Sequence, residues 1–409
     1  KQRRISNLNL LALGKELADW LLPAGTIREL FSHALKLAKN RGGVRLRLII
    51  ASHELKQIPW EFVYNPLSRA DSAFDFLALD PRLSIVRHEP LDMPHRRPIS
   101  IEKGTQDIEL RLFAASASPQ NITNIAVDYE MQGMKQILSE KQRFGEVKIT
   151  PTFYENASWQ DVQQALNQQG NFHICHFAGH GKVETEENNL TFDDVDLGRL
   201  LFSDQHDRKQ PITAGSFADL MQHSDIWMVT LGACDTGIRT TEHPWHSVAG
   251  ALIEHDIPVV IAMQNEIGDE AAVTFGREFY SMLAGGLSLD EAMSWSRRQM
   301  AARLRDENAQ INDMEWGVPV LYTRLADGVL VPELVKQGSK LAKKTRKEIQ
   351  AEATRVWETE INVDQEVGTI HKDGDVIGVN AKGKDTRGKQ INVKQKAKKV
   401  KGKMIGAEL

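Results

Sequence analysis

A histidine and a cysteine follow two apolar segments of the sequence, and these residue types can form a nucleophilic pair. His180 comes shortly after FHICHF at 172–177, and glycines flank it on both sides. Cys234 comes shortly after DIWMVTLG at 225–232. A free thiol is mostly protonated at neutral pH, and a neighbouring imidazole can take or balance its proton. The two residues therefore predict a thiol nucleophile with an imidazole as its base.

The two apolar segments predict neighbouring strands that would position this pair. Strands that are apolar on both faces are typical of a parallel sheet covered by helices. We expect His180 on a loop at the carboxyl edge of such a sheet, where α/β proteins build their sites, with Cys234 beside it. The backbone amides of Gly181 and Cys234 could then donate to an oxyanion. Taken singly, each side chain fits core packing, and their joint placement favours the catalytic interpretation.

The other cysteine and histidines near these segments fit structural roles better. Cys175 lies inside the predicted strand and fits core packing, and His176 beside it fits support of the fold rather than a base. His243 and His246 open a predicted helix, and no third ligand accompanies them, so we expect no metal site. With only two cysteines in the chain, a disulfide framework is excluded.

The first 98 residues predict an α+β unit. Two helices open it, and strands follow at 44–52 and 83–88. The second helix carries apolar residues at helical spacing, namely Ile27, Leu30, Phe31, Ala34, Leu35 and Ala38. Prolines at 94–98 mark the end of the unit.

Residues 99–330 alternate between strand and helix patterns, which predicts an α/β domain. Strands are expected at 108–116, 147–153, 172–177, 225–232, 258–263 and 316–324. Helices are expected at 127–138, 158–166, 269–283 and 289–303. Capping boxes are expected at Ser158 with Asp161 and at Ser288 with Glu291.

The C-terminal part changes in composition and contains a repeat. Residues 331–358 predict a charged helical linker, and residues 359–409 predict a glycine-punctuated module for recognition or recruitment. In this module INVDQ at 361–365 recurs as INVKQ at 391–395, and GDVIG at 374–378 recurs as GKMIG at 402–406. A small β-rich fold is expected, with disorder as the alternative, because two copies alone make a marginal fold.

Composition and charge exclude several classes of protein. Hydrophobic residues make up 41% and charged residues 26% of the 409 residues, which fits a globular protein. The net charge of -4 argues against capture of the whole chain by nucleic acid or membrane. No run of about 18 apolar residues occurs, so we expect a cytoplasmic protein without a membrane anchor. The first residue is lysine, which leaves a preceding module open. No cofactor is expected.

The motifs at both candidate residues resemble those of a known family. HFAGHG at 176–181 and LGACDTG at 231–237 resemble the two signature motifs of CHAT-domain peptidases, relatives of caspases, gingipain-like peptidases and separase. The resemblance covers roughly residues 8–325 and includes IPWEFVYNP at 58–66, FLALDPRLSIVRHEP at 76–90, a long segment at 248–300 and WGVPVLY at 316–322. One departure is Ala262-Met263-Gln264, where many members carry a tryptophan, which could reshape a substrate groove.

This resemblance implies a caspase-like α/β/α sandwich with a mostly parallel sheet and an N-terminal α+β entry or pseudo-peptidase subdomain. It implies His180 as general acid and base, Cys234 as nucleophile and Gly181 as an oxyanion contact. It further implies regulated, limited proteolysis of a protein target, in a bacterial defence or cell-death pathway. An activating protein partner or upstream sensor would switch the peptidase on.

Two other interpretations stay open at this point. In the first, the caspase-like core is a catalytically silent scaffold or signalling adaptor. In the second, the basic residues at 394–403 contact nucleic acid, although no aromatic residues interleave them. The substrate-binding residues do not follow from the motifs. Acidic residues in predicted loops could favour a basic P1 side chain but equally fit solvated charges, namely Asp194, Asp196, Asp235 and Asp269.

Overall fold

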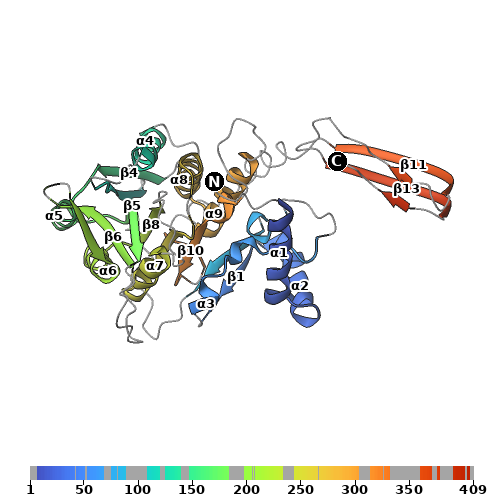
Figure 1. Ribbon diagram of the computed structural model, residues 1–409, viewed down its shortest axis with the longest axis horizontal. Coiled ribbons are helices and arrows are strands. Elements are labelled where there is room, and N and C mark those ends of the chain that lie inside the picture. The colour runs from blue at the N-terminus through green and yellow to red at the C-terminus, as the bar shows by residue number, and fades with distance from the viewer. Residues whose placement is uncertain are drawn as a thin grey trace. The chain divides into compact units, whose positions relative to one another are not determined.

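A computed structural model gives the structure of the protein (Figure 1). It describes residues 7–41, 43–50, 53–68, 75–80, 82–88, 108–119, 125–139, 147–183, 198–204, 206, 208–233, 244–265, 267–303, 314–325, 327–331, 360–370, 375–377, 390–400 and 403–405. The chain divides into two compact units, Lys1–Ser339 and Lys340–Leu409. None of the described helices is long and apolar enough to cross a membrane.

The first unit is built on one large sheet. Its main path runs β1-β2-β10-β9-β8-β5-β3-β4, and β6 and β7 extend from the end of β5. Along this path the neighbours are parallel except β10 and β9, while β5, β6 and β7 pair antiparallel. The strands are β1 Val44–Leu48, β2 Leu83–Arg87, β3 Ile108–Ser116, β4 Val147–Tyr154, β5 Ile174–Val183, β6 Gly198–Ser203, β7 Lys209–Thr213, β8 Met228–Ala233, β9 Val259–Met263 and β10 Pro319–Thr323.

Helices cover both faces of this sheet. Figure 1 shows α4, α8 and α9 packed together on one face and α6 and α7 on the other. The helices are α1 Asn7–Leu21, α2 Thr26–Arg41, α3 His53–Lys56, α4 Ile125–Ser139, α5 Trp159–Gln169, α6 Ala214–His223, α7 Pro244–Glu254, α8 Asp269–Ala284 and α9 Leu289–Arg303. The predicted α/β/α sandwich with a mostly parallel sheet is confirmed.

The capping boxes predicted for α5 and α9 are also confirmed. At α5 the Ser158 side chain accepts from the Asp161 amide, and the Asp161 carboxylate accepts from the Ser158 amide. Ser288 and Glu291 make the same reciprocal pair of bonds at α9. These bonds satisfy amides that would otherwise lack partners in the first turn of each helix.

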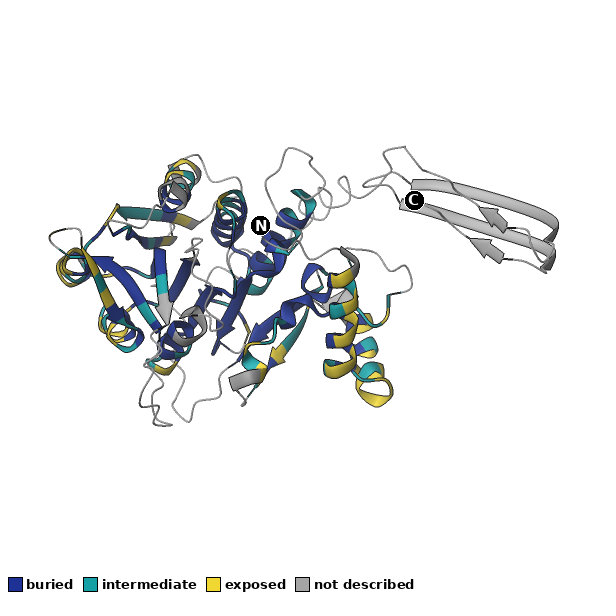
Figure 2. Ribbon diagram, viewed as in Figure 1, coloured by how far each residue is buried: buried dark blue, intermediate teal, exposed yellow. Residues whose placement is uncertain are grey.

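The core lies along the central strands, which are buried on both faces as Figure 2 shows. Every residue of β9 is buried. Between the sheet and α5 and α6, a group of aromatic rings packs together, namely Trp159, Phe177, Phe202 and Phe217. Because Phe177 belongs to β5 and Phe202 to β6, this packing fixes β6 against the end of β5.

Two features of the first unit differ from the sequence-based expectations. The sequence patterns did not indicate β6, β7 or α6 as separate elements. In α2, Phe31 and Leu35 are buried as expected, but Ile27 and Leu30 are 51% and 65% exposed. Figure 2 shows the exposed residues on the outer surfaces of α1 and α2. Helical spacing of apolar residues predicted a wider buried stripe than this helix has.

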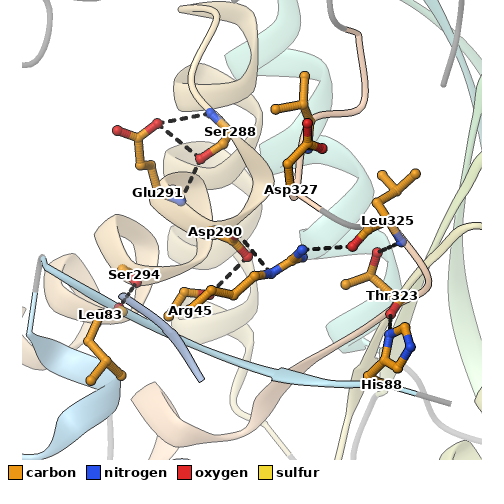
Figure 3. Close-up of polar contacts among 12 residues, drawn as sticks. Arg45, Leu83, His88, Ser288, Asp290, Glu291, Ser294, Thr323, Leu325 and Asp327 are labelled. Carbon is orange, nitrogen blue, oxygen red and sulfur yellow. Dashed lines mark hydrogen bonds and ion pairs between the residues drawn. The ribbon is translucent and has the colours of Figure 1, made fainter. Parts of the chain in front are cut away.

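The N-terminal strands are joined to the rest of the unit by polar contacts (Figure 3). Arg45 of β1 places Nε 3.2 Å from Oδ2 of Asp290 in α9, and its Nη1 donates to the Leu325 carbonyl at 2.7 Å. Ser84 of β2 donates to the other oxygen of Asp290 at 2.9 Å. His88 lies with Nδ1 3.0 Å from the Thr323 carbonyl oxygen. β1 and β2 belong to the same sheet as the later strands, because β2 also pairs with β10. Separate domains at 1–98 and 99–330 stay a prediction.

A buried polar cluster includes the glutamate of the IPWEF segment and gives it a structural role. Glu61 is fully buried and pairs with Arg87 of β2, whose Nη2 lies 2.8 Å from Oε2 of Glu61. Gln264 accepts from Arg87 and donates to Glu61 and to the Gly317 carbonyl. Gln264 belongs to the segment that departs from the family pattern, and in this structure it contacts the fold and is buried.

The second unit consists of the sequence repeat. The strands are β11 Glu360–Ile370, β12 Asp375–Ile377, β13 Gln390–Val400 and β14 Lys403–Ile405. β11 pairs with β13 and β12 with β14, both parallel, so that each repeat contributes one long and one short strand. The linker helix predicted at 331–358 lies outside the described residues except for Val331.

Candidate active site

His180 lies in a strand and not on the predicted loop. β5 pairs with β8 as far as Gly179 opposite Ala233, and it continues by pairing antiparallel with β6, where His180 lies opposite Leu201. The loop prediction was wrong because the apolar segment alone does not show that a later strand, β6, extends the pairing. The His180 side chain is completely buried.

The strand register brings the residues that directly precede the two candidate positions to the same level of the sheet. Gly179 and Ala233 are the last register pair of β5 and β8, and each directly precedes one candidate residue in the sequence. Cys234 itself, together with residues 235–243, lies outside the described residues. Gly181 is half-buried and lies opposite Leu200. The dyad of His180 with Cys234, and the oxyanion contacts of Gly181 and Cys234, therefore stay predictions.

Gly179 has a packing role that the sequence interpretation missed. A Cβ at this position would lie 2.6 Å from Cζ of the Phe177 ring and 3.2 Å from the Ala117 carbonyl oxygen. In the sequence, glycines on both sides of His180 would let the backbone approach a substrate closely. For Gly179 the space is taken by the protein's own core.

A buried polar network lies on the neighbouring part of β5. Nε2 of His176 is 3.0 Å from Oε1 of Glu130 in α4, and its Nδ1 is 3.2 Å from the Tyr280 hydroxyl in α8. Tyr280 donates to Oγ1 of Thr230 in β8 at 3.3 Å. All four residues are buried. The network therefore ties α4, α8, β5 and β8 together, as expected for His176 as a support of the fold.

Glu130 also contacts the strand that leads toward Cys234. A Cβ at Gly232 would lie 2.8 Å from Oε1 and 2.9 Å from Oε2 of Glu130. Among the described residues no donor reaches Oε2, although this atom is buried. Burial of a carboxylate oxygen without a donor costs free energy.

Sequence reasoning did not single out Glu130, although one signal was present. Val127, Met131 and Met134 form the apolar face of α4, and Glu130 occupies the same face at helical spacing. A charged residue on an apolar face is buried only with a partner. The partner, His176, lies 46 residues later in the chain and could not be assigned from spacing alone.

Cys175 is part of the core, as predicted. It is buried in β5, and burial raises the pKa of its thiol to about 12. A thiol with this pKa stays protonated and unreactive at neutral pH. Burial likewise raises the pKa of the Tyr280 hydroxyl, so this group acts as a neutral hydrogen-bond donor.

The remaining candidates do not gather at this edge within the described residues. Asp194, Asp196, Asp235 and His243 lie outside them, and the side chain of His246 in α7 is not described. Asp269 is exposed at the start of α8. Among the described residues no group of three His, Cys, Asp or Glu side chains is arranged to hold a metal ion.

The model of the CHAT domain matches residues 11–357. The chain belongs to the CHAT domain family. The match includes both candidate motifs and the N-terminal strands, and it ends before the repeats of the second unit. The comparison with curated proteins gives no match.

Solved structures similar to this CHAT protein include two of the separase–securin complex of Saccharomyces cerevisiae. They share 13% and 12% identity with a TM-score of 0.34, and the match covers 66% of this chain but only 15% of the separase chain. The Drosophila initiator caspase Dronc is also similar, at 8% identity and a TM-score of 0.29, over 57% of this chain and 91% of the caspase chain.

Proposed function

We propose that this CHAT protein is a regulated cysteine endopeptidase that cleaves a protein target by means of His180 and Cys234. The observation that carries the proposal is the register of β5 and β8. Gly179 lies opposite Ala233 on two neighbouring strands. In the sequence, His180 directly follows the first of these residues and Cys234 the second. An imidazole and a thiol that lie within hydrogen-bond reach of each other can exchange a proton.

The proposed reaction has two steps. His180 takes the Cys234 proton, and the thiolate attacks the carbonyl carbon of the scissile peptide bond. The amides of Gly181 and Cys234 donate to the resulting oxyanion, and His180 then gives the proton to the leaving amine. Water, with His180 again as base, hydrolyses the thioester, which releases the new carboxyl terminus and restores the thiol. The reaction needs no cofactor.

Burial of His180 supports the regulated character of this activity. An imidazole that is completely buried cannot contact a peptide substrate until the chain around it moves. We therefore propose that the conformation described here is inactive and that an activating protein partner or upstream sensor exposes His180. A pathway of bacterial defence or cell death fits such an enzyme, since limited proteolysis is useful there only when it follows a signal.

The same burial favours the second candidate function, a catalytically silent scaffold that transmits binding. A scaffold would keep His180 as a packed core residue under all conditions. The two functions differ in one consequence: a peptidase produces new chain termini that depend on Cys234, and a scaffold produces none.

The decisive experiment compares cell lysates that contain wild-type protein or the Cys234→Ala variant. Mass spectrometry of N-termini should find new termini only with the wild type. Cys175→Ser is the matched control, since it changes the other cysteine in the chain and should leave the new termini unchanged. Equal sets of termini with wild type and Cys234→Ala in lysates that contain the activating signal would refute the peptidase and leave the scaffold.

A further inference from the structure

The two repeats of the second unit stack on each other in strict register. Along β11 and β13 four positions carry the same residue opposite itself, namely Ile361 with Ile391, Asn362 with Asn392, Val363 with Val393 and Gln365 with Gln395. β12 and β14 continue this arrangement, with Ile377 opposite Ile405. Each repeat is therefore one coil of a parallel stack, in which like residues follow one another from coil to coil.

The charged positions of the two coils have opposite sign. Asp364 lies opposite Lys394, Glu366 opposite Lys396, and Asp375 opposite Lys403. The strands of the first coil contain acidic residues and no lysine or arginine, and those of the second contain lysines and no acidic residue. Opposite charges on neighbouring strands stabilise their pairing, and like charges destabilise it.

Each coil has one edge that pairs with no described strand. β11 pairs only with β13 and β12 only with β14 among the described residues, so the second edge of each strand presents backbone donors and acceptors. A stack of repeats becomes stable when at least about three are joined, because single repeats bury too little surface. Two coils alone therefore leave both ends of the stack in need of a further coil.

We propose that the second unit joins copies of this chain head to tail, with the basic coil of one copy pairing with the acidic coil of the next. Such a contact repeats the register and the charge complementarity that already join the two coils within one chain. Contacts between two acidic coils or two basic coils would place like charges opposite each other. The resulting contact is heterologous, so assembly continues beyond the dimer. This inference does not depend on the proposed peptidase activity.

The test uses sedimentation velocity of the full chain over a range of protein concentrations. Wild-type protein should form species larger than a dimer as its concentration rises, and added salt should reduce them because it screens the charges. Asp364→Lys with Glu366→Lys should abolish these species, since lysine then lies opposite Lys394 and Lys396 at both positions. A monomer at all concentrations would overturn the proposal, as would association that this variant leaves unchanged.

A charge-swapped variant keeps the test valid if the first variant fails to fold. It combines Asp364→Lys and Glu366→Lys with Lys394→Glu and Lys396→Glu, so that its own coils stay complementary. This variant should assemble with itself, but it should not enter assemblies of the wild type, because every mixed contact places like charges opposite each other at these positions. Free mixing of fluorescently labelled copies of the two proteins would overturn the proposal. So would loss of the wild-type assemblies on nuclease treatment, because it would show that nucleic acid joins the chains.

Discussion

The carboxylate of Glu130 lies so close to Gly232 that a Cβ at Gly232 would be 2.8 Å from Oε1. Gly232 is two residues before Cys234, and Glu130 pairs with His176, four residues before His180. One buried side chain is thus packed against both strands that lead to the proposed dyad. The glycine of the LGACDTG segment leaves room for this carboxylate.

We expect Gly232→Ala to lower the free energy of unfolding by about 1–3 kcal/mol, because the new methyl group forces Glu130 or the strand to move. Chemical denaturation measures this change. Gly276→Ala in α8 is the matched control, since no atom lies within 4 Å of its added Cβ. Replacing a helical glycine by alanine stabilises by about 0.5–1 kcal/mol. Equal effects of the two substitutions would contradict the contact with Glu130.

The pair of Glu130 and His176 gives a second prediction. His176→Leu should lower the free energy of unfolding by about 1–3 kcal/mol, because Glu130 is left buried without its donor. Adding Glu130→Leu should restore part of this loss, since apolar replacement of both partners can be nearly neutral. Chemical denaturation of the single and double variants measures both the loss of unfolding free energy and its partial recovery.

An exposed ion pair between Lys135 of the same helix and Glu155, which follows β4, is the control for that series. Lys135 and Glu155 lie 2.6 Å apart, with side chains 43% and 51% exposed. Glu155→Gln should change the free energy of unfolding by less than about 1 kcal/mol. A double variant of Glu130 and His176 that is as unstable as the sum of its single variants would show that the two side chains act independently.

The α/β pattern of the first unit could be predicted from the sequence, because its strands are apolar on both faces and its helices carry capping boxes. Long-range pairing could not be predicted. The strand at His180 depends on β6, and the burial of Glu130 depends on His176. Whether Ile27 and Leu30 are exposed depends on what packs against α2. The helical spacing of apolar residues gives no information about that. For Cys234 the position in the chain is known, and its catalytic role stays a prediction.

The buried thiol of Cys175 predicts a dependence of stability on pH. Burial raises the folded-state pKa of this thiol to about 12, well above its ordinary value, so the folded state holds the proton more tightly than the unfolded chain. The stabilisation is fully present below about pH 9 and is lost as pH rises toward 12. Cys175→Ala should therefore show a flatter decline of the unfolding free energy over this interval. An identical slope for wild type and variant would contradict a raised pKa.

Two glycines with positive φ allow the cost of a left-handed backbone to be measured separately from the cost of a side-chain clash. A Cβ at Gly328, with φ of 69°, would clash with the Asp290 carboxylate that holds Arg45. At Gly286, with φ of 77°, no atom lies within 4 Å of such a Cβ. Gly286→Ala should cost about 1–2 kcal/mol for the left-handed backbone alone. Gly328→Ala should cost more in the same denaturation measurement, and an equal cost would show that the Asp290 contact is unimportant.

The central claim is that His180 activates the thiol of Cys234, and the rate of alkylation at Cys234 as a function of pH tests it most directly. Peptide mapping separates Cys234 from the inert Cys175. In the wild type the rate should follow an apparent pKa well below the ordinary thiol value of about 8.5, because the imidazole takes the proton. In His180→Gln the apparent pKa should return to about 8.5 or higher. Profiles that coincide for wild type and His180→Gln would contradict the dyad.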